Sequence, residues 1–409
     1  MRAFPRGDRL IALADQVLYA GTNFTLTILL AVLSDIEALG RYALVASVSA
    51  LLHSLFVGFV LEPLTIFGSG KSDARVRSVY SHLAAVTGAL VFVVGILLLW
   101  ASSQSSTEYI RFIALGFILF ASQSAVLCAK RIAVIERGVK ASALVSIRYS
   151  LGAFSTAMIL AVSVGYSEKA LVFAFFVAGM VSAGGWLLSS IRKRFSSREL
   201  LSIFSDVRRY TVWTVISSVP AAVSTHGIFW IAELTADRAI VGQLKLCEQL
   251  IIPLGQIFMT MNLLDQIESA TEFRANNSDL IRARVRARTW AYLKLAVGYS
   301  AAVLASVMAI RQFGADIVEG FVLALAVYCA SSLFNAFSVP RNVAAKASRR
   351  PEHVAIAYFL MSVTICVIGF AWQPSTPTGL ALVLLAGWIV HAISLQASFV
   401  ALVARPGRS

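Results

Sequence analysis

The stretch ADQVLYAGTNFTLTILLAVL, residues 14–33, is the first long apolar run of the chain, and it contains Asp15, Gln16 and Asn23. A helix needs about 20 mainly apolar residues to cross the hydrocarbon layer of a membrane. A charged side chain near the middle of a bilayer costs roughly 2.5 to 3.5 kcal/mol, so it usually needs a partner, an aqueous cavity or an interfacial position. The run therefore predicts a membrane-spanning helix with polar residues that need an explanation.

The composition places the whole chain in the same class. Of its 409 residues, 58% are hydrophobic and 14% are charged, whereas about 25% charged residues are usual in soluble domains. The sequence therefore predicts an all-α integral membrane protein of about twelve transmembrane helices. We expect these helices at residues 10–33, 41–69, 79–101, 112–128, 143–164, 170–190, 210–232, 240–264, 291–310, 317–338, 354–372 and 380–403.

The basic residues indicate how the chain is oriented. Most of the 35 Lys and Arg residues fall before the first span, after the last, and in every second connection, including the connections to which we assign Lys130 and Arg341. Because Lys and Arg gather in short cytoplasmic connections, both termini are predicted to be cytoplasmic. The net charge of +14 is thereby explained by topology and by contact with anionic membrane lipids, without a nucleic-acid partner. The connections predicted to lie outside contain Arg41, Arg111, Lys169, Arg238 and Arg311.

Several activities are not supported by the sequence. The four cysteines are single and lie in predicted helices, and the five histidines show no metal-binding spacing. The predicted outer connections are short, which leaves no room for an external catalytic domain. We therefore expect no metal, no cofactor and no enzymatic activity.

Two pairs of similar segments suggest that the chain is duplicated. Gly40 and Gly242 each precede a predicted helix, and Arg131 in a basic segment matches Arg341 in another at nearly the same offset. Six crossings restore the original direction, so the halves are predicted to be parallel repeats related by an axis along the membrane normal. We expect an N-terminal lobe at residues 1–195 and a C-terminal lobe at residues 210–409.

The segment between the predicted lobes has helical periodicity. Residues 196–209 begin with Ser196 and Glu199 at capping-box spacing, and apolar residues including Ile203 and Val207 recur beside charged ones. This pattern predicts an amphipathic linker helix on the inner membrane surface.

The chain resembles a known family in four features. These are the twelve predicted helices, the aspartate in the first of them, the turn Leu39-Gly-Arg-Tyr42, and the Arg137-Gly138 segment with its echo after the tenth helix. Together they resemble the polysaccharide transporters and O-antigen flippases of the multidrug/oligosaccharidyl-lipid/polysaccharide (MOP) exporter superfamily. The resemblance implies two six-helix lobes that face each other in a V, with helices 1, 2, 7 and 8 lining a central cavity.

The resemblance also implies a function. The chain is expected to be a flippase that moves an undecaprenyl-pyrophosphate-linked oligosaccharide, or a similar lipid-linked sugar, across the bacterial inner membrane by alternating access. A polysaccharide polymerase and assembly proteins are its expected partners. One alternative is an antiporter of the same superfamily that exchanges H⁺ or Na⁺ for a small molecule or drug. Another is an integral membrane transferase in polysaccharide assembly, which the short outer connections disfavour.

Four polar residues are candidates for one site in the N-terminal half. Asp15, Glu62 and Arg148 are predicted to lie at the same depth in the inner third of the membrane, and Asn23 lies nearer the midplane. The charges can form a static pair, a gate or coupling-ion site, or an interfacial group exposed to water.

Three further candidates lie in the predicted helix at 240–264. Lys245 and Glu248 are spaced i,i+3 and share a face, with Gln249 beside them. A local ion pair and a contact with the headgroup of the substrate are both open readings of this spacing.

Overall fold

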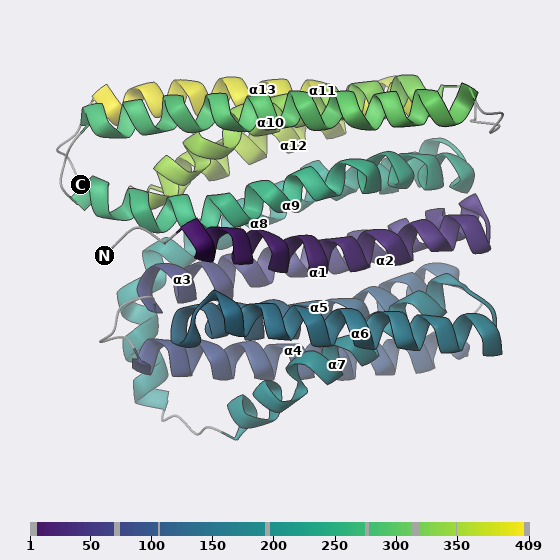
Figure 1. Ribbon diagram of the computed structural model, residues 1–409, viewed down its shortest axis with the longest axis horizontal. Helices are drawn as coiled ribbons and strands as arrows, with labels where there is room; N and C mark the ends of the chain where they lie inside the picture. Colours follow the sequence, from purple (N-terminus) through teal and green to yellow (C-terminus); the bar gives the residue numbers. More distant parts are fainter. Residues whose placement is uncertain are drawn as a thin grey trace. The chain divides into compact units, whose positions relative to one another are not determined.

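The computed structural model describes residues 6–68, 74–104, 107–192, 197–274, 278–312, 320–348 and 350–404. Every regular element in these ranges is helical, as predicted (Figure 1). The elements are α1 (Arg6–Leu33), α2 (Ile36–Phe56), the π-helix η1 (Val57–Leu61), α3 (Glu62–Gly68), α4 (Ala74–Ser103), α5 (Glu108–Arg137), α6 (Val139–Ser163), α7 (Glu168–Ile191), α8 (Ser197–Thr235), α9 (Arg238–Arg274), α10 (Ser278–Gln312), α11 (Phe321–Ala347), α12 (Glu352–Trp372) and α13 (Pro377–Ala404). Because α2, η1 and α3 follow one another without a break, the described residues form twelve helical rods.

Eleven of the rods in the described ranges are long and apolar enough to cross a membrane. The twelfth is α9, which was predicted as a span at residues 240–264 and is helical there, but carries Lys245, Glu248 and Asp265. Lys245 and Glu248 lie within the predicted span and make it less apolar. Several helices also extend beyond their predicted spans, and α5 reaches Arg137 rather than ending at Cys128.

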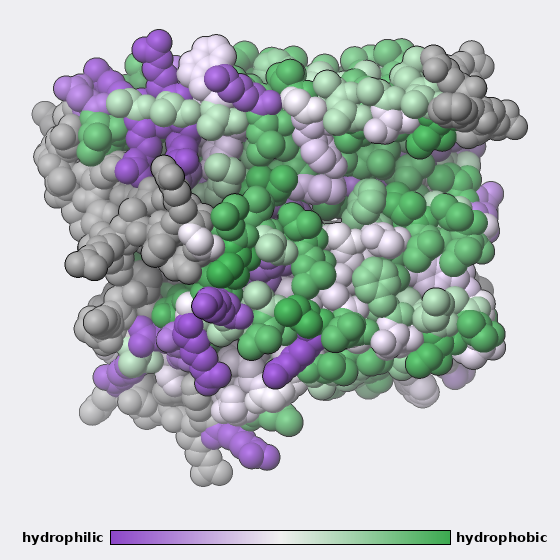
Figure 2. All heavy atoms as spheres, viewed as in Figure 1, coloured by the Kyte–Doolittle hydropathy of each residue, from purple (hydrophilic) through white to green (hydrophobic). Residues whose placement is uncertain are grey.

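Large apolar side chains remain exposed along the spans. Val162 is 84% exposed, Met158 70% and Val32 70%. On the face shown in Figure 2, hydrophobic residues cover the middle of the helices and hydrophilic residues gather toward one end of the view. Exposed apolar surface of this extent suits contact with lipid tails rather than water.

The chain divides into two compact units. The division falls at Pro220, inside α8, so that one unit reaches Val219 and the other begins at Pro220. In the first unit, α5 packs against α4, α7 and α2; in the second, α11 packs against α10, α13 and α9. The pairs α6 with α7 and α12 with α13 also correspond. The repeated pairing agrees with the duplication inferred from the sequence.

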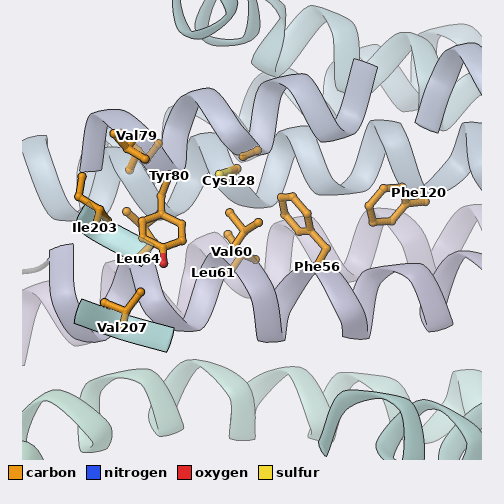
Figure 3. Packing of buried hydrophobic residues seen from close by; sticks show 12 residues of the cluster. Phe56, Val60, Leu61, Leu64, Val79, Tyr80, Phe120, Cys128, Ile203 and Val207 are labelled. Carbon is orange, nitrogen blue, oxygen red and sulfur yellow. The ribbon is translucent and has the colours of Figure 1, made fainter. Parts of the chain in front are cut away.

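The predicted linker helix at residues 196–209 is not a separate element. Ser196 lies outside the described residues, and from Ser197 onward the segment is the first part of α8, which continues to Thr235. Ile203 and Val207 are buried in a cluster with residues of α3 and α4 (Figure 3). These two residues of the inferred apolar face therefore pack against protein, whereas we expected them to lie on the membrane surface.

The first part of α8 is also hydrogen-bonded to the π-helix η1 and packs closely against it. The Thr214 hydroxyl donates a hydrogen bond to the Gly58 carbonyl oxygen at 2.7 Å. A Cβ atom at Gly58 would lie 2.7 Å from the Thr214 carbonyl oxygen and closer still to the Ser218 hydroxyl. Only glycine allows the two backbones to approach this closely.

Gly58→Ala is therefore expected to destabilise the protein by about 1 to 3 kcal/mol, because the added methyl group must displace backbone. Thermal unfolding of the purified protein in detergent measures this loss. The matched control is Gly21→Ala in α1, where a Cβ atom would meet nothing within 4 Å and helix propensity favours alanine. Equal unfolding midpoints for the two variants would contradict the tight contact.

Candidate functional site

The carboxylate of Asp15 in α1 is buried and paired. Its Oδ1 lies 3.1 Å from the Lys130 Nζ of α5, and its Oδ2 accepts a hydrogen bond from the Ser142 hydroxyl of α6 at 2.7 Å. Asp15 is 7% exposed and Lys130 is 6% exposed. A buried ion pair of this kind is costly to break, because the remaining charge is left uncompensated.

The chain brings these three side chains together through a tight link. Lys130 lies near the end of α5 and Ser142 near the start of α6, and the single residue Gly138 joins the two helices with a φ of 85°. This left-handed backbone favours glycine. Since α1 packs along α6, Asp15 meets both side chains.

The polar contacts continue along the same face of α1. The Lys130 Nζ lies 4.6 Å from the centre of the Tyr19 ring, and the Tyr149 hydroxyl donates to Asn23 Oδ1 at 2.7 Å. The two tyrosine rings are 4.9 Å apart between centres. We call this set the α1 polar cluster; its members are Asp15, Tyr19, Asn23, Lys130, Ser142 and Tyr149. Spacing of four residues on α1 gives its three α1 members one face.

The predicted charge layer of Asp15, Glu62 and Arg148 is not formed as expected. Arg148 is exposed. It lies on the outer face of α6 with Ile147, whereas the adjacent Tyr149 is fully buried toward α1. Glu62 is half-buried at the start of α3 and interacts electrostatically with Arg131. Of the readings left open for these three charges, a pair between Asp15 and Arg148 is not present, and Lys130 pairs with Asp15 instead.

Lys130 was missed because it was assigned to a cytoplasmic connection. The apolar pattern does contain the signal, since Ala129 and Ile132 continue the buried face of α5 past Cys128. A helix extended by two turns places Lys130 inside the protein. Tyr149 and Ser142 were also missed, although they are spaced i,i+7 on one helical face.

A second polar cluster lies in the other unit, where the ion pair expected from the i,i+3 spacing of Lys245 and Glu248 is present. Lys245 is 4% exposed, and its Nζ lies 5.4 Å from the centre of the Phe229 ring. Glu248 Oε1 is 3.4 Å from the His226 Nδ1 of α8. Gln249 is buried beside them. We call Lys245, Glu248 and His226 the α9 polar cluster.

The same unit contains another buried ionic contact that the sequence did not reveal. Arg288 of α10 pairs with Asp265 of α9 at 2.7 Å, and the Tyr292 hydroxyl donates to Asp265 at 2.9 Å. Arg288 was assigned to a connection, whereas α10 already begins at Ser278. Each unit thus buries a carboxylate against a cation from another helix.

Comparison with known proteins shows similarity only at the level of structure. The sequence matches no described family, and no curated protein is similar to it. A MATE multidrug transporter, DinF-BH, solved in complex with R6G, shares 15% identity with a TM-score of 0.69, covering 97% of this chain and 94% of its own. A MATE family multidrug resistance transporter of the MOP superfamily, in an outward-facing conformation, shares 13% identity with a TM-score of 0.68, covering 98% and 97%.

A third solved structure is a MOP superfamily transporter from Pyrococcus furiosus, whose described feature is a binding pocket of reversed polarity. It shares 12% identity with a TM-score of 0.65, covering 98% of this chain and 95% of its own. At these identities the similarity establishes the fold. The chain has the two-lobed, all-helical fold of MATE transporters, which confirms the predicted fold class. The predicted O-antigen flippase branch stays a prediction.

Proposed function

We propose that the chain is a multi-pass membrane transporter that exchanges a coupling cation for a small organic solute by alternating access. The observation that carries this proposal is the buried Asp15–Lys130 pair, held between α1, α5 and α6. Ionisable groups inside membrane helices mark ion pathways and coupling sites, because their burial is otherwise unfavourable. The shared fold with MATE multidrug transporters supports the same class of activity.

A change in the charge of Asp15 is expected to change how α1 packs against α5 and α6. A proton that binds Asp15 Oδ1 removes the negative charge and leaves the Lys130 ammonium buried without compensation. That state is unfavourable in the packing described, so protonation favours a rearranged one. H⁺ suits this site better than Na⁺, because the Lys130 ammonium already occupies the position beside Asp15 that a metal cation would take.

The orientation in the membrane is part of the proposal. The distribution of Lys and Arg along the sequence supports cytoplasmic termini, and the resemblance to the exporter superfamily supports a bacterial inner membrane. With this orientation Asp15, near the start of the first span, lies toward the cytoplasm.

A lipid-linked oligosaccharide flippase remains the second candidate. It is favoured by Lys245, a buried ammonium on α9, the eighth rod, since the family resemblance expects helix 8 to line the cavity. Separation of Lys245 from Glu248 would free a cation for a diphosphate headgroup. A polysaccharide polymerase and assembly proteins would then be its partners.

Transport by the purified protein in liposomes distinguishes the two candidates. With an acidic interior, outward H⁺ flow is expected to drive accumulation of ethidium, a small organic cation; liposomes with Na⁺ inside test the other coupling ion. A parallel assay follows a fluorescent undecaprenyl-pyrophosphate-linked oligosaccharide and its exposure to a membrane-impermeant quencher. Translocation of this lipid without ethidium uptake would contradict the antiporter and favour the flippase.

A further inference from the structure

Three cations are buried among the described residues, namely Lys130, Lys245 and Arg341, and the contacts of Arg341 differ from those of the two lysines. Lys130 faces Asp15 and Lys245 faces Glu248. Arg341 is 9% exposed and faces only neutral groups in the described part of the chain.

The guanidinium of Arg341 is held rigidly by three helices. Its Nε donates to Gln396 Oε1 of α13 at 2.6 Å, and its Nη1 donates to the Thr289 hydroxyl of α10 at 3.1 Å and to the Phe337 carbonyl oxygen. The guanidinium carbon lies 3.6 Å from the centre of the Phe337 ring. None of these groups carries a negative charge. The positive charge is oriented without being neutralised, and burial of such a charge is unfavourable until an anion is bound.

Arg341 lines a shallow crevice between α11, α12 and α13, which in this packing has no room for a water molecule. Its other lining residues are Ala345, His353, Leu395, Ser398 and Phe399, so polar and apolar side chains both border it. Polar donors beside a fixed arginine are suited to the oxygens of a phosphate group.

The surface next to the crevice is apolar and exposed. Ile356 and Phe359 on α12 are 50% and 58% exposed, and Val400 on α13 is 57% exposed. Ile356 lies about one turn from His353 along the same helix. A ligand that meets both surfaces has an anionic phosphate at one end and a hydrocarbon chain at the other.

We propose that Arg341, with His353 and Ser398, binds the phosphate headgroup of an anionic membrane phospholipid. The lipid supplies the negative charge that the described protein does not, and its acyl chains lie along α12 and α13. This site belongs to one unit, and it is independent of the solute that the protein transports and of the cation that drives transport.

Thermal unfolding of delipidated protein in nonionic detergent tests this site. Mixed micelles with dioleoylphosphatidylglycerol are expected to raise the unfolding midpoint of the wild type more than micelles with dioleoylphosphatidylcholine. Arg341→Gln should weaken the apparent affinity for the anionic lipid by about tenfold or more, the usual effect of losing a charge-assisted hydrogen bond. The matched control, Arg286→Gln, removes one exposed charge from α10 of the same unit and should keep the full response.

The alternative results are distinct. A response of Arg341→Gln equal to that of the wild type would overturn the proposal. An equal stabilisation by inorganic phosphate alone would show that the site takes a free anion and would overturn the lipid assignment. If Arg341→Gln does not fold, Ser398→Ala and His353→Gln, which leave the hydrogen bonds of Arg341 intact, serve instead; an unchanged preference for the anionic lipid in both would overturn the proposal. None of these measurements depends on transport activity.

Discussion

Asp15→Asn is expected to lower H⁺-driven ethidium uptake by about 5- to 150-fold. This is the factor that corresponds to typical coupling free energies between two sites. The asparagine cannot exchange a proton, and it leaves the Lys130 ammonium buried without its carboxylate. The second effect alone costs about 3 to 5 kcal/mol of stability. Initial rates in proteoliposomes, normalised to the amount of inserted protein, measure the transport effect separately from the yield.

The combined variant Asp15→Asn/Lys130→Met separates coupling from stability. Removing both charges leaves no buried ion, so the unfolding midpoint should recover most of what either single variant loses. Transport should not recover, because the exchangeable proton site is gone. Arg148→Gln is the matched control: its side chain is exposed, and we expect a change in stability within about 0.5 kcal/mol and unchanged uptake. Normal H⁺-driven uptake by the double variant would show that the pair only holds the helices together.

Substitutions in the α9 polar cluster are expected to change solute affinity in opposite directions. Glu248→Gln leaves the Lys245 ammonium uncompensated, which should raise the KM for ethidium by about tenfold or more, since two charges 4 Å apart interact by about 4 kcal/mol at an effective dielectric of 20. Lys245→Met leaves the carboxylate and should lower the KM for the same cation. For a diphosphate-linked substrate the order is reversed, and Lys245→Met should abolish translocation while Lys245→Arg retains part of it.

The neutral double variant Lys245→Met/Glu248→Gln is the control for this prediction. It removes the charges while keeping similar volumes, so its KM should fall between those of the single variants. Equal KM values for both single variants, with normal amounts of inserted protein, would place the cluster outside the solute path. The sign of the effect thus decides between a cationic solute and an anionic lipid-linked one.

The sequence predicted an all-α membrane protein because that class depends on the overall composition and on the lengths of the apolar runs. Apolar runs of membrane-spanning length, such as residues 14–33, form helices in lipid wherever their neighbours lie, since each helix satisfies its own backbone hydrogen bonds. The duplication was visible for a similar reason, as Arg131 and Arg341 occur in matching positions of the two halves. The Lys245–Glu248 pair followed from helical spacing alone, because both residues belong to one helix.

The partner of Asp15 depended on tertiary structure. The sequence indicated that a carboxylate in the first span needs a partner, and the depth expected for Arg148 made it one candidate. Depth alone does not fix which way a side chain points around its helix, and each residue turns by about 100° from the last. Arg148 therefore faces outward while Tyr149 faces α1, and only the packing of α1, α5 and α6 brings Lys130 to Asp15.

The same reason explains why the sequence misplaced Arg341 and the first part of α8. From the sequence, Arg341 belonged to a cytoplasmic connection and residues 196–209 to a surface helix, because both segments carry charges next to apolar spans. Local pattern determines that such segments are helical and which of their faces is apolar. Whether that face meets lipid or protein is decided by distant residues, such as Leu64 and Tyr80 around Ile203, or Thr289 and Gln396 around Arg341. The fold class was thus set by the sequence of each segment, and the charged sites by contacts between segments far apart in the chain.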